Sequence, residues 1–316
     1  MTINQLQYLK ELVYTGNFSE AAENLGISQP ALSAQIKQLE IEVELSLIDR
    51  NARPITLTKD GEAFFEISMD ILQRMEALKN LPVDLEEDIK GELKIGMIPT
   101  LAPYFVPLFI DKLQQNYPDL NITIEELITE DIVHKVRTGH LDAGVISTPI
   151  EVKKLHFRKL FYERFYLYVS NKHKLFGKDE VELNDFEMED LWYLQEGNCF
   201  QNQVNAICSL AGNPKGRQNL NYKSNSIESL RRIVESTKGM TFIPELSTLQ
   251  IPSENEEMIK PIKKNQPVRE ISLVFASVYA KKRMLDVFCD QVLKALPAYM
   301  KHPPSNWLVD TELKFD

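Results

Sequence analysis

The chain has 316 residues, of which 43% are hydrophobic and 26% are charged, so it is long enough to bury more than one core. It contains no apolar run that could span a bilayer, and its N-terminus lacks the basic-then-apolar pattern of a secretory signal, so we expect a cytoplasmic protein without a membrane partner. The formal net charge of −10 argues against a protein that coats nucleic acid non-specifically, but it allows a domain whose basic groups gather on one docking face.

Residues 1–60 predict three short helices followed by a small two-stranded wing. The second helix is expected at 19–25, and Ser28 has the side chain and position of an N-cap for the third helix. The strands of the wing are expected at 47–50 and 55–58. This order of elements predicts a winged helix-turn-helix.

The third helix and the wing present small, hydrogen-bonding or basic side chains on the side opposite the apolar stripe. Such groups suit base edges and phosphates in a major groove. The candidate DNA contacts are Ser28, Gln29, Pro30, Ser33, Lys37, Arg50 and Arg53. The spacing alone also fits a three-helix bundle without a DNA role, so at this point both interpretations stay open.

Residues 61–90 predict a linker. Asp60–Asn80 carries an apolar stripe that needs a partner, and a coiled-coil contact with a second copy of the chain would supply one. Leu81–Lys90 is acidic and contains Pro82, so it is interpreted as a hinge. We therefore expect a dimerisation helix followed by a flexible joint.

From Gly91 onward, short apolar strands alternate with helices, which is typical of a parallel sheet covered on both faces. The expected strands are Leu93–Ile98, Leu120–Glu125, Leu141–Ile146, Phe165–Val169, Trp192–Leu194, Met240–Pro244 and Ile271–Phe275, and the expected helices are Phe105–Asn116, Asp131–Thr138 and Lys281–Leu296. Residues 91–301 thus predict two Rossmann-like lobes, arranged as in periplasmic binding proteins around a cleft. The first lobe takes about 91–162 and 269–301, the second takes about 163–268, and 302–316 is a peripheral tail.

The three cysteines, Cys199, Cys208 and Cys289, are too few for a disulfide framework in a cytoplasmic protein of this size. Asn198 is expected to cap a helix that begins at Cys199 and ends near Gly212, and the positive end of the helix dipole would favour the Cys199 thiolate. Cys208 lies on the flank of the same helix. From spacing alone, all three could equally be ordinary core cysteines, and for Cys289 the core interpretation is favoured.

Other kinds of site find little support in the sequence. The five histidines do not have metal-ligand spacing with the cysteines, and no glycine-rich phosphate loop is present. We therefore expect no metal and no cofactor.

The stretch 18–40, together with 47–50 and 57–61, resembles the LysR-type transcriptional regulators over a long, ordered run. The resemblance extends over nearly the whole chain. It implies binding to promoter DNA, contact with RNA polymerase, a homo-oligomer such as a dimer of dimers, and a regulatory rather than enzymatic role. Many members carry arginine where this chain has Ala34, so one DNA contact of the family is expected to be missing.

The second half is similar to the peroxide-sensing members of that family. The matching pieces are 194–203 with Cys208, 96–100, Thr129 and 269–274. The resemblance implies that hydrogen peroxide oxidises Cys199, that Cys208 then captures it in a disulfide, and that the peroxide pocket contains Thr100, Thr129, Asn198 and Arg269. Asn198 replaces a histidine found in many of these members, and asparagine cannot carry a proton as histidine does.

The implied disulfide conflicts with the predicted helix. Nine positions separate Cys199 from Cys208, which in a helix means about 13 Å along the axis and opposite faces. A disulfide tolerates Cα atoms no more than about 7 Å apart, so the bond requires the helix to melt. Two alternatives remain at this stage: a family member that binds a small metabolite between the lobes, and a thiol peroxidase or reductase.

Overall fold

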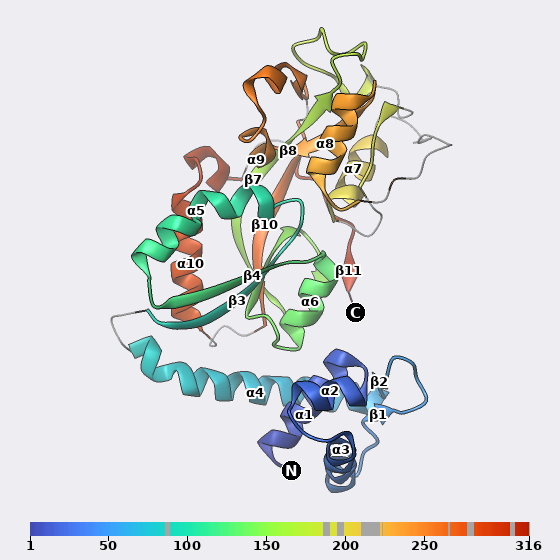
Figure 1. The fold of residues 1–316 in the computed structure, drawn as a ribbon, viewed down its shortest axis with the longest axis vertical. Helices are drawn as coiled ribbons and strands as arrows, with labels where there is room; N and C mark the ends of the chain where they lie inside the picture. Colours follow the sequence, from blue (N-terminus) through green and yellow to red (C-terminus); the bar gives the residue numbers. More distant parts are fainter. Residues whose placement is uncertain are drawn as a thin grey trace.

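The structure, a computed structural model, describes residues 1–85, 89–185, 190–194, 199–209, 222, 224–264, 266–276, 281–303 and 307–315. A helical N-terminal domain lies at one end of the molecule, and a long helix leads from it to a larger α/β domain (Figure 1). Within the described residues, no helix is both long and apolar enough to cross a membrane.

The N-terminal domain has the predicted winged helix-turn-helix. Its elements are α1 (Ile3–Thr15), α2 (Phe18–Asn24), α3 (Gln29–Val43), β1 (Ile48–Asp49) and β2 (Thr56–Leu57). Thr2 forms a capping box with Gln5 at the start of α1, and Gly16 ends that helix in the left-handed conformation. Leucines and alanines from all three helices close the core together with Leu47 and Ile48 of the wing.

Helix α4 (Lys59–Leu85) is longer than the sequence predicts. The expected hinge at 81–90 is wrong for residues 81–85, which continue the helix. Pro82 lies in the last turns of α4. Its missing N–H removes one hydrogen bond near the end of the helix, and the long stretch of helix before it is already formed.

The α/β domain is built on one curled sheet. Among the described residues it contains β3 (Gly91–Met97), β4 (Leu120–Glu126), β5 (Ala143–Thr148), β7 (His156–Val169), β8 (Met240–Pro244), β9 (Ile259–Pro261) and β10 (Val268–Phe275). The order is β4-β3-β5-β10-β7-β8, with β9 also pairing with β7. The helices are α5 (Ala102–Asn116), α6 (Thr129–Arg137), α7 (Cys199–Ser209), α8 (Ile227–Ser236), α9 (Glu245–Thr248) and α10 (Lys282–Lys294).

The prediction of a parallel sheet holds for β3, β4 and β5 and is wrong for the rest, because β10 pairs antiparallel with both β5 and β7. Trp192–Leu194 is not a strand; the chain there forms a single bridge, from Leu191 to Met240. The two-lobed architecture itself is as predicted, with β7 and β10 running between the lobes (Figure 1).

Strand β7 passes from one lobe into the other. Its first part pairs with β10 as far as Arg164, and its second part, from Phe165 to Val169, pairs with β8. The expected lobe boundary near residue 162 therefore falls inside a continuous strand. Because the backbone does not break there, β7 ties the two lobes together.

The C-terminal segment is not peripheral, contrary to the prediction. Strand β11 (Lys314–Phe315) pairs in parallel with β6 (Glu151–Val152), and Val309 and Thr311 are fully buried. Residues 308, 310, 312 and 314 are exposed, so the segment alternates inward and outward as an extended chain on a surface does.

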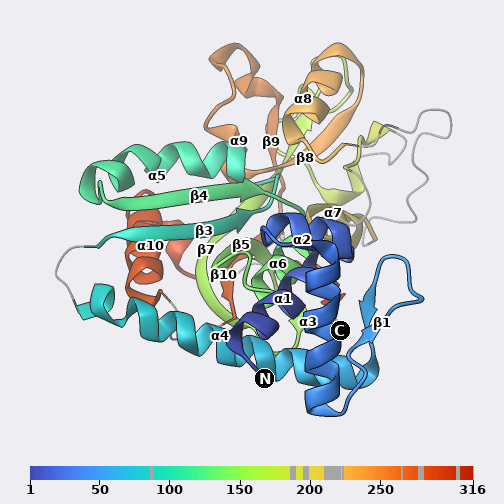
Figure 2. The same ribbon diagram turned by 60° about the horizontal axis from the view of Figure 1, so that its bottom comes forward.

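The N-terminal domain contacts the α/β domain just beyond the C-terminal end of α6. The rings of Tyr14 and His140 stack with centroids 3.6 Å apart, and His140 Nε2 lies 3.1 Å from Glu11 Oε2. Lys10 Nζ donates to the Gly139 carbonyl at 2.9 Å. Figure 2 shows the N-terminal domain coming forward beside α6. Next to this contact, α1, α4 and the α/β domain line a cavity of about 380 Å³.

Candidate redox site and nucleic-acid interface

The first turn of α3 is the most exposed part of the helix-turn-helix. Ser28 caps the helix by accepting from the Ala31 N–H at 3.3 Å, and Pro30 fits because its missing N–H has no helical partner there. Of the predicted DNA contacts, one is half-buried, Ser33, and the others are exposed: Ser28, Gln29, Pro30, Lys37, Arg50 and Arg53. Six of the seven candidate contacts are therefore accessible to a partner.

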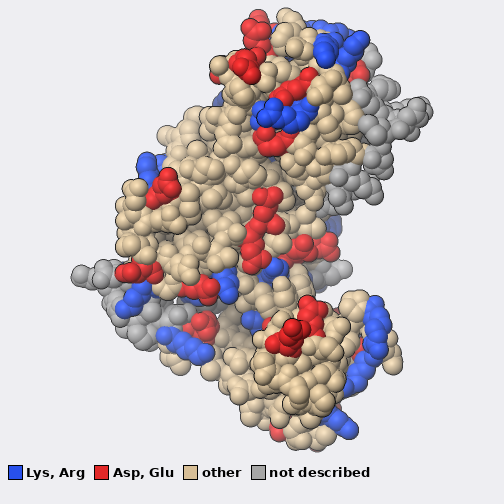
Figure 3. Space-filling model, in the orientation of Figure 1, with Lys and Arg blue, Asp and Glu red and all other residues tan. Residues whose placement is uncertain are grey.

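The wing is held against α3 through Glu40. This carboxylate accepts from the backbone N–H groups of Leu47 and Ile48 at 2.9 and 3.2 Å, and from Arg50 Nη2 at 2.9 Å. Arg50, predicted as a phosphate contact, is thus already paired within the domain. Figure 3 shows basic side chains along the wing edge and acidic side chains over the neighbouring α2 surface.

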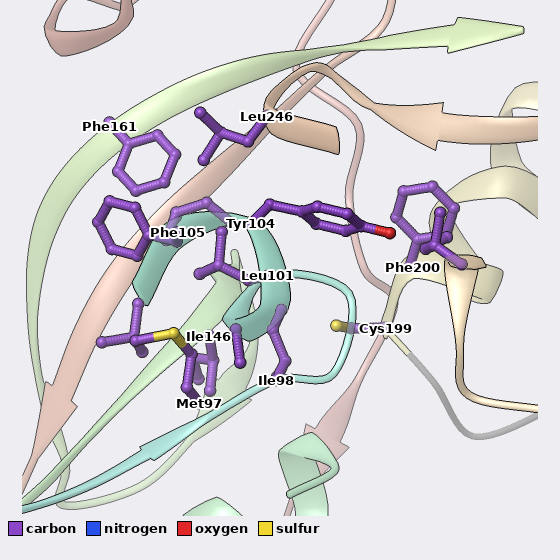
Figure 4. Close-up of a cluster of buried hydrophobic side chains, with 14 of the residues drawn as sticks. Met97, Ile98, Leu101, Tyr104, Phe105, Ile146, Phe161, Cys199, Phe200 and Leu246 are labelled. Carbon is purple, nitrogen blue, oxygen red and sulfur yellow. The ribbon is translucent and has the colours of Figure 1, made fainter. Parts of the chain in front are cut away.

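Cys199 is the first residue of α7, and its thiol is buried between the lobes. The thiol points toward the loop that joins β3 to α5 (Figure 4). Helix α6 comes close to it because β5 carries Gly144, where a Cβ would lie 2.1 Å from the Ile132 side chain. This close packing brings Thr129, at the start of α6, to the sulfur.

Burial raises the pKa of the Cys199 thiol, and neighbouring groups act in the opposite direction. The Thr129 side chain, the positive charge of Arg269 and the backbone N–H groups of Ser147 and Phe200 all lower this pKa. The sequence predicts that the helix start favours the thiolate; in the structure that preference exists, but desolvation outweighs it. The thiol is therefore protonated at rest and is surrounded by groups that stabilise its anion.

Arg269 is fully buried in an ion pair that the sequence analysis missed. Its guanidinium lies 2.6 Å from Glu163 Oε1, and neither side chain is exposed. Nη1 donates to Thr100 Oγ1 at 2.9 Å, Nη2 donates to the Thr100 carbonyl at 3.1 Å, and the guanidinium carbon lies 5.1 Å from the centre of the Phe200 ring. Glu163 Oε2 accepts from the Leu246 N–H at 3.1 Å. The pair thus fixes the cation near the thiol.

The signal for Glu163 was present in the sequence. It is a carboxylate in the middle of the long apolar run that became β7, directly opposite Arg269 on β10. A charged residue on a buried strand needs a partner of opposite charge. Burial raises the pKa of Glu163, and Arg269 is the largest influence that opposes this.

The structure brings together Thr100, Thr129, Cys199 and Arg269, four of the predicted site residues. Asn198, the fifth member of the predicted pocket, lies outside the described residues. The Thr129 hydroxyl is buried, and among the described residues it makes no hydrogen bond to nitrogen or oxygen. It is the kind of group that an entering polar molecule could satisfy.

Cys208 lies in the same helix as Cys199 and is fully buried. Desolvation raises the pKa of its thiol to about 12. Nine helical positions place the two Cα atoms about 13 Å apart along the axis, and neither cysteine is in a disulfide. In this conformation a bond between them is therefore impossible. Cys289 is buried in α10, as the core interpretation predicts.

Side chains of both lobes fill the space between them. Tyr104 of α5 donates from its hydroxyl to Glu228 of α8 at 2.9 Å, and its phenol reaches toward Phe200 (Figure 4). Tyr104, Phe200 and Arg269 are each under 2% exposed. Among the described residues, these three side chains thus occupy the part of the inter-lobe space next to Cys199.

Comparison with known proteins agrees with both halves of the fold. Residues 3–62 match the family described as "Bacterial regulatory helix-turn-helix protein, lysR family", and residues 86–297 match "LysR substrate binding domain". The chain is 30% identical over 275 residues, 87% of its length and 90% of the relative's, to the hydrogen peroxide-inducible genes activator of Haemophilus influenzae.

Two solved structures are similar over nearly their whole length. A full-length cysteine-to-aspartate variant of OxyR from Pseudomonas aeruginosa has a TM-score of 0.77 and 26% identity, covering 96% of this chain and 99% of that one. A cysteine-to-serine variant of Corynebacterium glutamicum OxyR with hydrogen peroxide bound has a TM-score of 0.60 and 25% identity, covering 93% and 92%. The chain therefore belongs to the LysR family of bacterial helix-turn-helix regulators, and the relative and the two structures named above are a peroxide-inducible activator and OxyR proteins.

Proposed function

We propose that this protein is a transcription regulator that senses hydrogen peroxide through Cys199 and responds by forming a Cys199–Cys208 disulfide. The observation that carries the proposal is the buried Cys199 thiol, which lies beside the Thr129 hydroxyl and the buried cation of Arg269; among the described residues, that hydroxyl makes no hydrogen bond to nitrogen or oxygen. The names of the matched relatives support it, since they are peroxide-inducible activators, and one matched structure holds hydrogen peroxide.

The first step is attack of the Cys199 thiolate on one oxygen of the peroxide. A sulfur–oxygen bond forms, the oxygen–oxygen bond breaks, and the sulfur is oxidised to a sulfenic acid. The departing hydroxide takes the proton released by the thiol and leaves as water. Arg269 and the backbone N–H groups near the sulfur stabilise the thiolate, while the Thr129 hydroxyl hydrogen-bonds the peroxide.

The second step closes the disulfide. The Cys208 thiolate attacks the sulfenic sulfur, the sulfur–sulfur bond forms, the sulfur–oxygen bond breaks, and hydroxide leaves as water with the Cys208 proton. Two thiols and one peroxide thus give one disulfide and two waters. Because Cys208 is buried in the same helix, α7 must unwind before this attack, and the closed bond then holds a different arrangement of the segment.

The output is a change in how the regulator engages promoter DNA. The exposed face of α3 reads base edges through Ser28, Gln29, Ser33 and Lys37, and the wing contacts phosphates. Ile67 and Leu78 on α4 are 63% and 69% exposed, which supports pairing of α4 with a second copy. We place the protein in the cytoplasm as a homo-oligomer, a dimer of dimers, that acts on RNA polymerase at the promoter.

Mass spectrometry of purified protein after a brief peroxide pulse tests the proposal, with DNase footprinting on promoter DNA before and after the pulse. We expect a Cys199–Cys208 linkage and an altered footprint in the wild type, and neither in Cys199→Ser. No linkage and no modified Cys199 in the wild type would rule out peroxide sensing. A response to inducer that survives in Cys199→Ser would indicate that the regulator senses a small metabolite instead. Consumption of many peroxide molecules per chain in the presence of a thiol reductant would indicate a peroxidase.

The first step should depend on pH with a definite sign. Because burial raises the Cys199 pKa above its ordinary value of 9.0, the thiolate is the minor species near neutrality. Its fraction, and with it the rate of sulfenic acid formation, should rise about tenfold per pH unit from pH 7 to pH 9. Stopped-flow measurement on Cys208→Ser isolates this step. A rate that is already flat above pH 7 would show that the thiolate is preformed.

A further inference from the structure

The C-terminal strap, residues 307–315, is the part of the fold that the proposed function does not use. We propose that this strap is a latch that holds α7 in its helical, reduced conformation and thereby sets how fast the disulfide forms. The inference rests on the proposed function, because it concerns the unwinding of α7 that the disulfide requires.

The strap is bonded directly to the helix that carries both cysteines. Asn202 Nδ2 donates to the Thr311 carbonyl at 3.1 Å, and Gln203 Nε2 donates to the Val309 carbonyl at 2.9 Å. Asn202 and Gln203 lie between Cys199 and Cys208, in the stretch that must unwind. Gln203, Val309 and Thr311 are fully buried, so the Gln203 bond is shielded from water and costs more to break than an exposed one, and the Asn202 bond is partly shielded.

The strap is in turn anchored on both sides of the redox site. The Val309 N–H donates to the Val268 carbonyl at 2.8 Å, and the Val268 N–H donates to the Trp307 carbonyl at 2.9 Å, so the strap extends the edge of β10 beside Arg269. The Thr311 hydroxyl donates to the Pro149 carbonyl, just after β5, and β11 pairs with β6. The strap therefore joins α7 to the strands of the first lobe.

Gln203 connects this arrangement to the thiol. Its Oε1 accepts from the Ser147 hydroxyl at 3.2 Å while its Nε2 holds the strap, and the backbone N–H of Ser147 points to the Cys199 sulfur. When α7 unwinds, Gln203 and Asn202 must release the two strap carbonyls. The latch therefore opposes the second chemical step and leaves the first, at Cys199 itself, largely unaffected.

Asn202→Ala tests the latch, and Asn205→Ala is its matched control. Asn205 is exposed on the same helix and accepts from Gln201 Nε2 at 2.8 Å, so each substitution removes one hydrogen bond, but Asn202→Ala alone releases the strap. Alanine favours helix at both positions, so intrinsic propensity would slow unwinding in both variants. A second pair lies on the strap. Thr311→Val loses the bond to the Pro149 carbonyl and the bond accepted from the Leu313 N–H, and Glu312→Ala changes an exposed neighbour.

Rapid-quench alkylation with mass spectrometry separates sulfenic acid from disulfide. In Asn202→Ala we expect conversion to the disulfide about fivefold faster than in the wild type, as the loss of one hydrogen bond predicts, and in Thr311→Val, which loses two, at least about fivefold faster. Sulfenic acid formation should stay within about twofold in both. The control variants should match the wild type or convert more slowly. Hydrogen exchange in the reduced protein should show α7 amides exchanging faster in Asn202→Ala than in Asn205→Ala.

Equal conversion and equal exchange in Asn202→Ala and its control would overturn the latch while leaving the proposed function standing, provided that the wild type still forms the disulfide. A wild type that forms no disulfide would overturn both. The exchange measurement needs no peroxide, so it judges the restraint on α7 even if the redox chemistry fails.

Discussion

Arg269→Met should lower the free energy of unfolding by about 3–5 kcal/mol, because it leaves the Glu163 carboxylate buried without a partner. Both members of the pair are fully buried and 2.6 Å apart, so water cannot replace the lost cation. Oxidation of Cys199 should also slow by about tenfold or more, since the thiolate loses the charge of Arg269 that lowers its pKa. Urea unfolding and stopped-flow oxidation measure the two effects.

The double variant Glu163→Gln/Arg269→Met is the control for the lost stability. It removes both charges, so it should recover most of the unfolding free energy while oxidation stays slow. The gap between the single and double variants should depend on pH. Without Arg269, the folded-state pKa of Glu163 lies well above its unfolded value of about 4.3. The stability of the single variant therefore falls as pH rises from about 4.3 to the raised pKa of the folded state. A single variant as stable as the wild type at pH 7 would contradict this account.

Gly61→Ala should destabilise the N-terminal domain by about 3 kcal/mol, at the upper end of overpacking effects. A Cβ at this position would lie 2.0 Å from the Leu47 carbonyl oxygen, a backbone atom that cannot move without displacing the wing. The displaced wing should weaken promoter binding by at least about tenfold, which corresponds to about 1.4 kcal/mol. Fluorescence anisotropy with promoter DNA and thermal unfolding would measure the two effects.

The matched control is Gly177→Ala, where a Cβ meets nothing within 4 Å. It should leave both DNA binding and stability close to the wild type, since no atom has to move. Peroxide oxidation of Cys199 should be unchanged in both variants, because Gly61 lies at the start of α4 against Leu47 and a Cβ at Gly177 meets no atom. Unaltered promoter affinity in Gly61→Ala would show that the wing tolerates the shift.

Local signals in the sequence predicted the N-terminal domain well. The Thr2 capping box, the Ser28 cap and the left-handed Gly16 each act within a few residues, so short windows are enough to recognise them. The hinge was misplaced because Pro82 suggests an interruption locally, whereas α4 as a whole continues past it to Leu85.

The redox site was predicted in part. Thr100, Thr129, Cys199 and Arg269 do come together, but the residue types did not show how strongly burial would oppose the thiolate of Cys199. Glu163 was missed because its meaning depends on the cross-strand register of β7 with β10, a contact over about a hundred residues that spacing does not give. Local sequence patterns do not show which residues of distant strands pair with each other.

The C-terminal strap was missed for a related reason. From Val309 to Phe315, every second residue is charged, namely Asp310, Glu312 and Lys314, which is the pattern of a strand on a surface. Pro297, Pro303 and Pro304 upstream suggested a peripheral tail instead, and a short strand is recognisable only by the edge it joins. That edge is formed by β6, about 160 residues earlier in the chain.

Helix α6 sets the distance between the Cys199 site and the N-terminal domain. Its first residue, Thr129, adjoins the Cys199 sulfur, and just past its last turn the ring of His140 stacks on Tyr14 of the N-terminal domain at 3.6 Å. A nine-residue helix is about 13 Å long and stiff, so a tilt of about 5° moves its far end by about 1 Å. Helix α6 thus connects the surroundings of the Cys199 thiol directly to the helix-turn-helix domain.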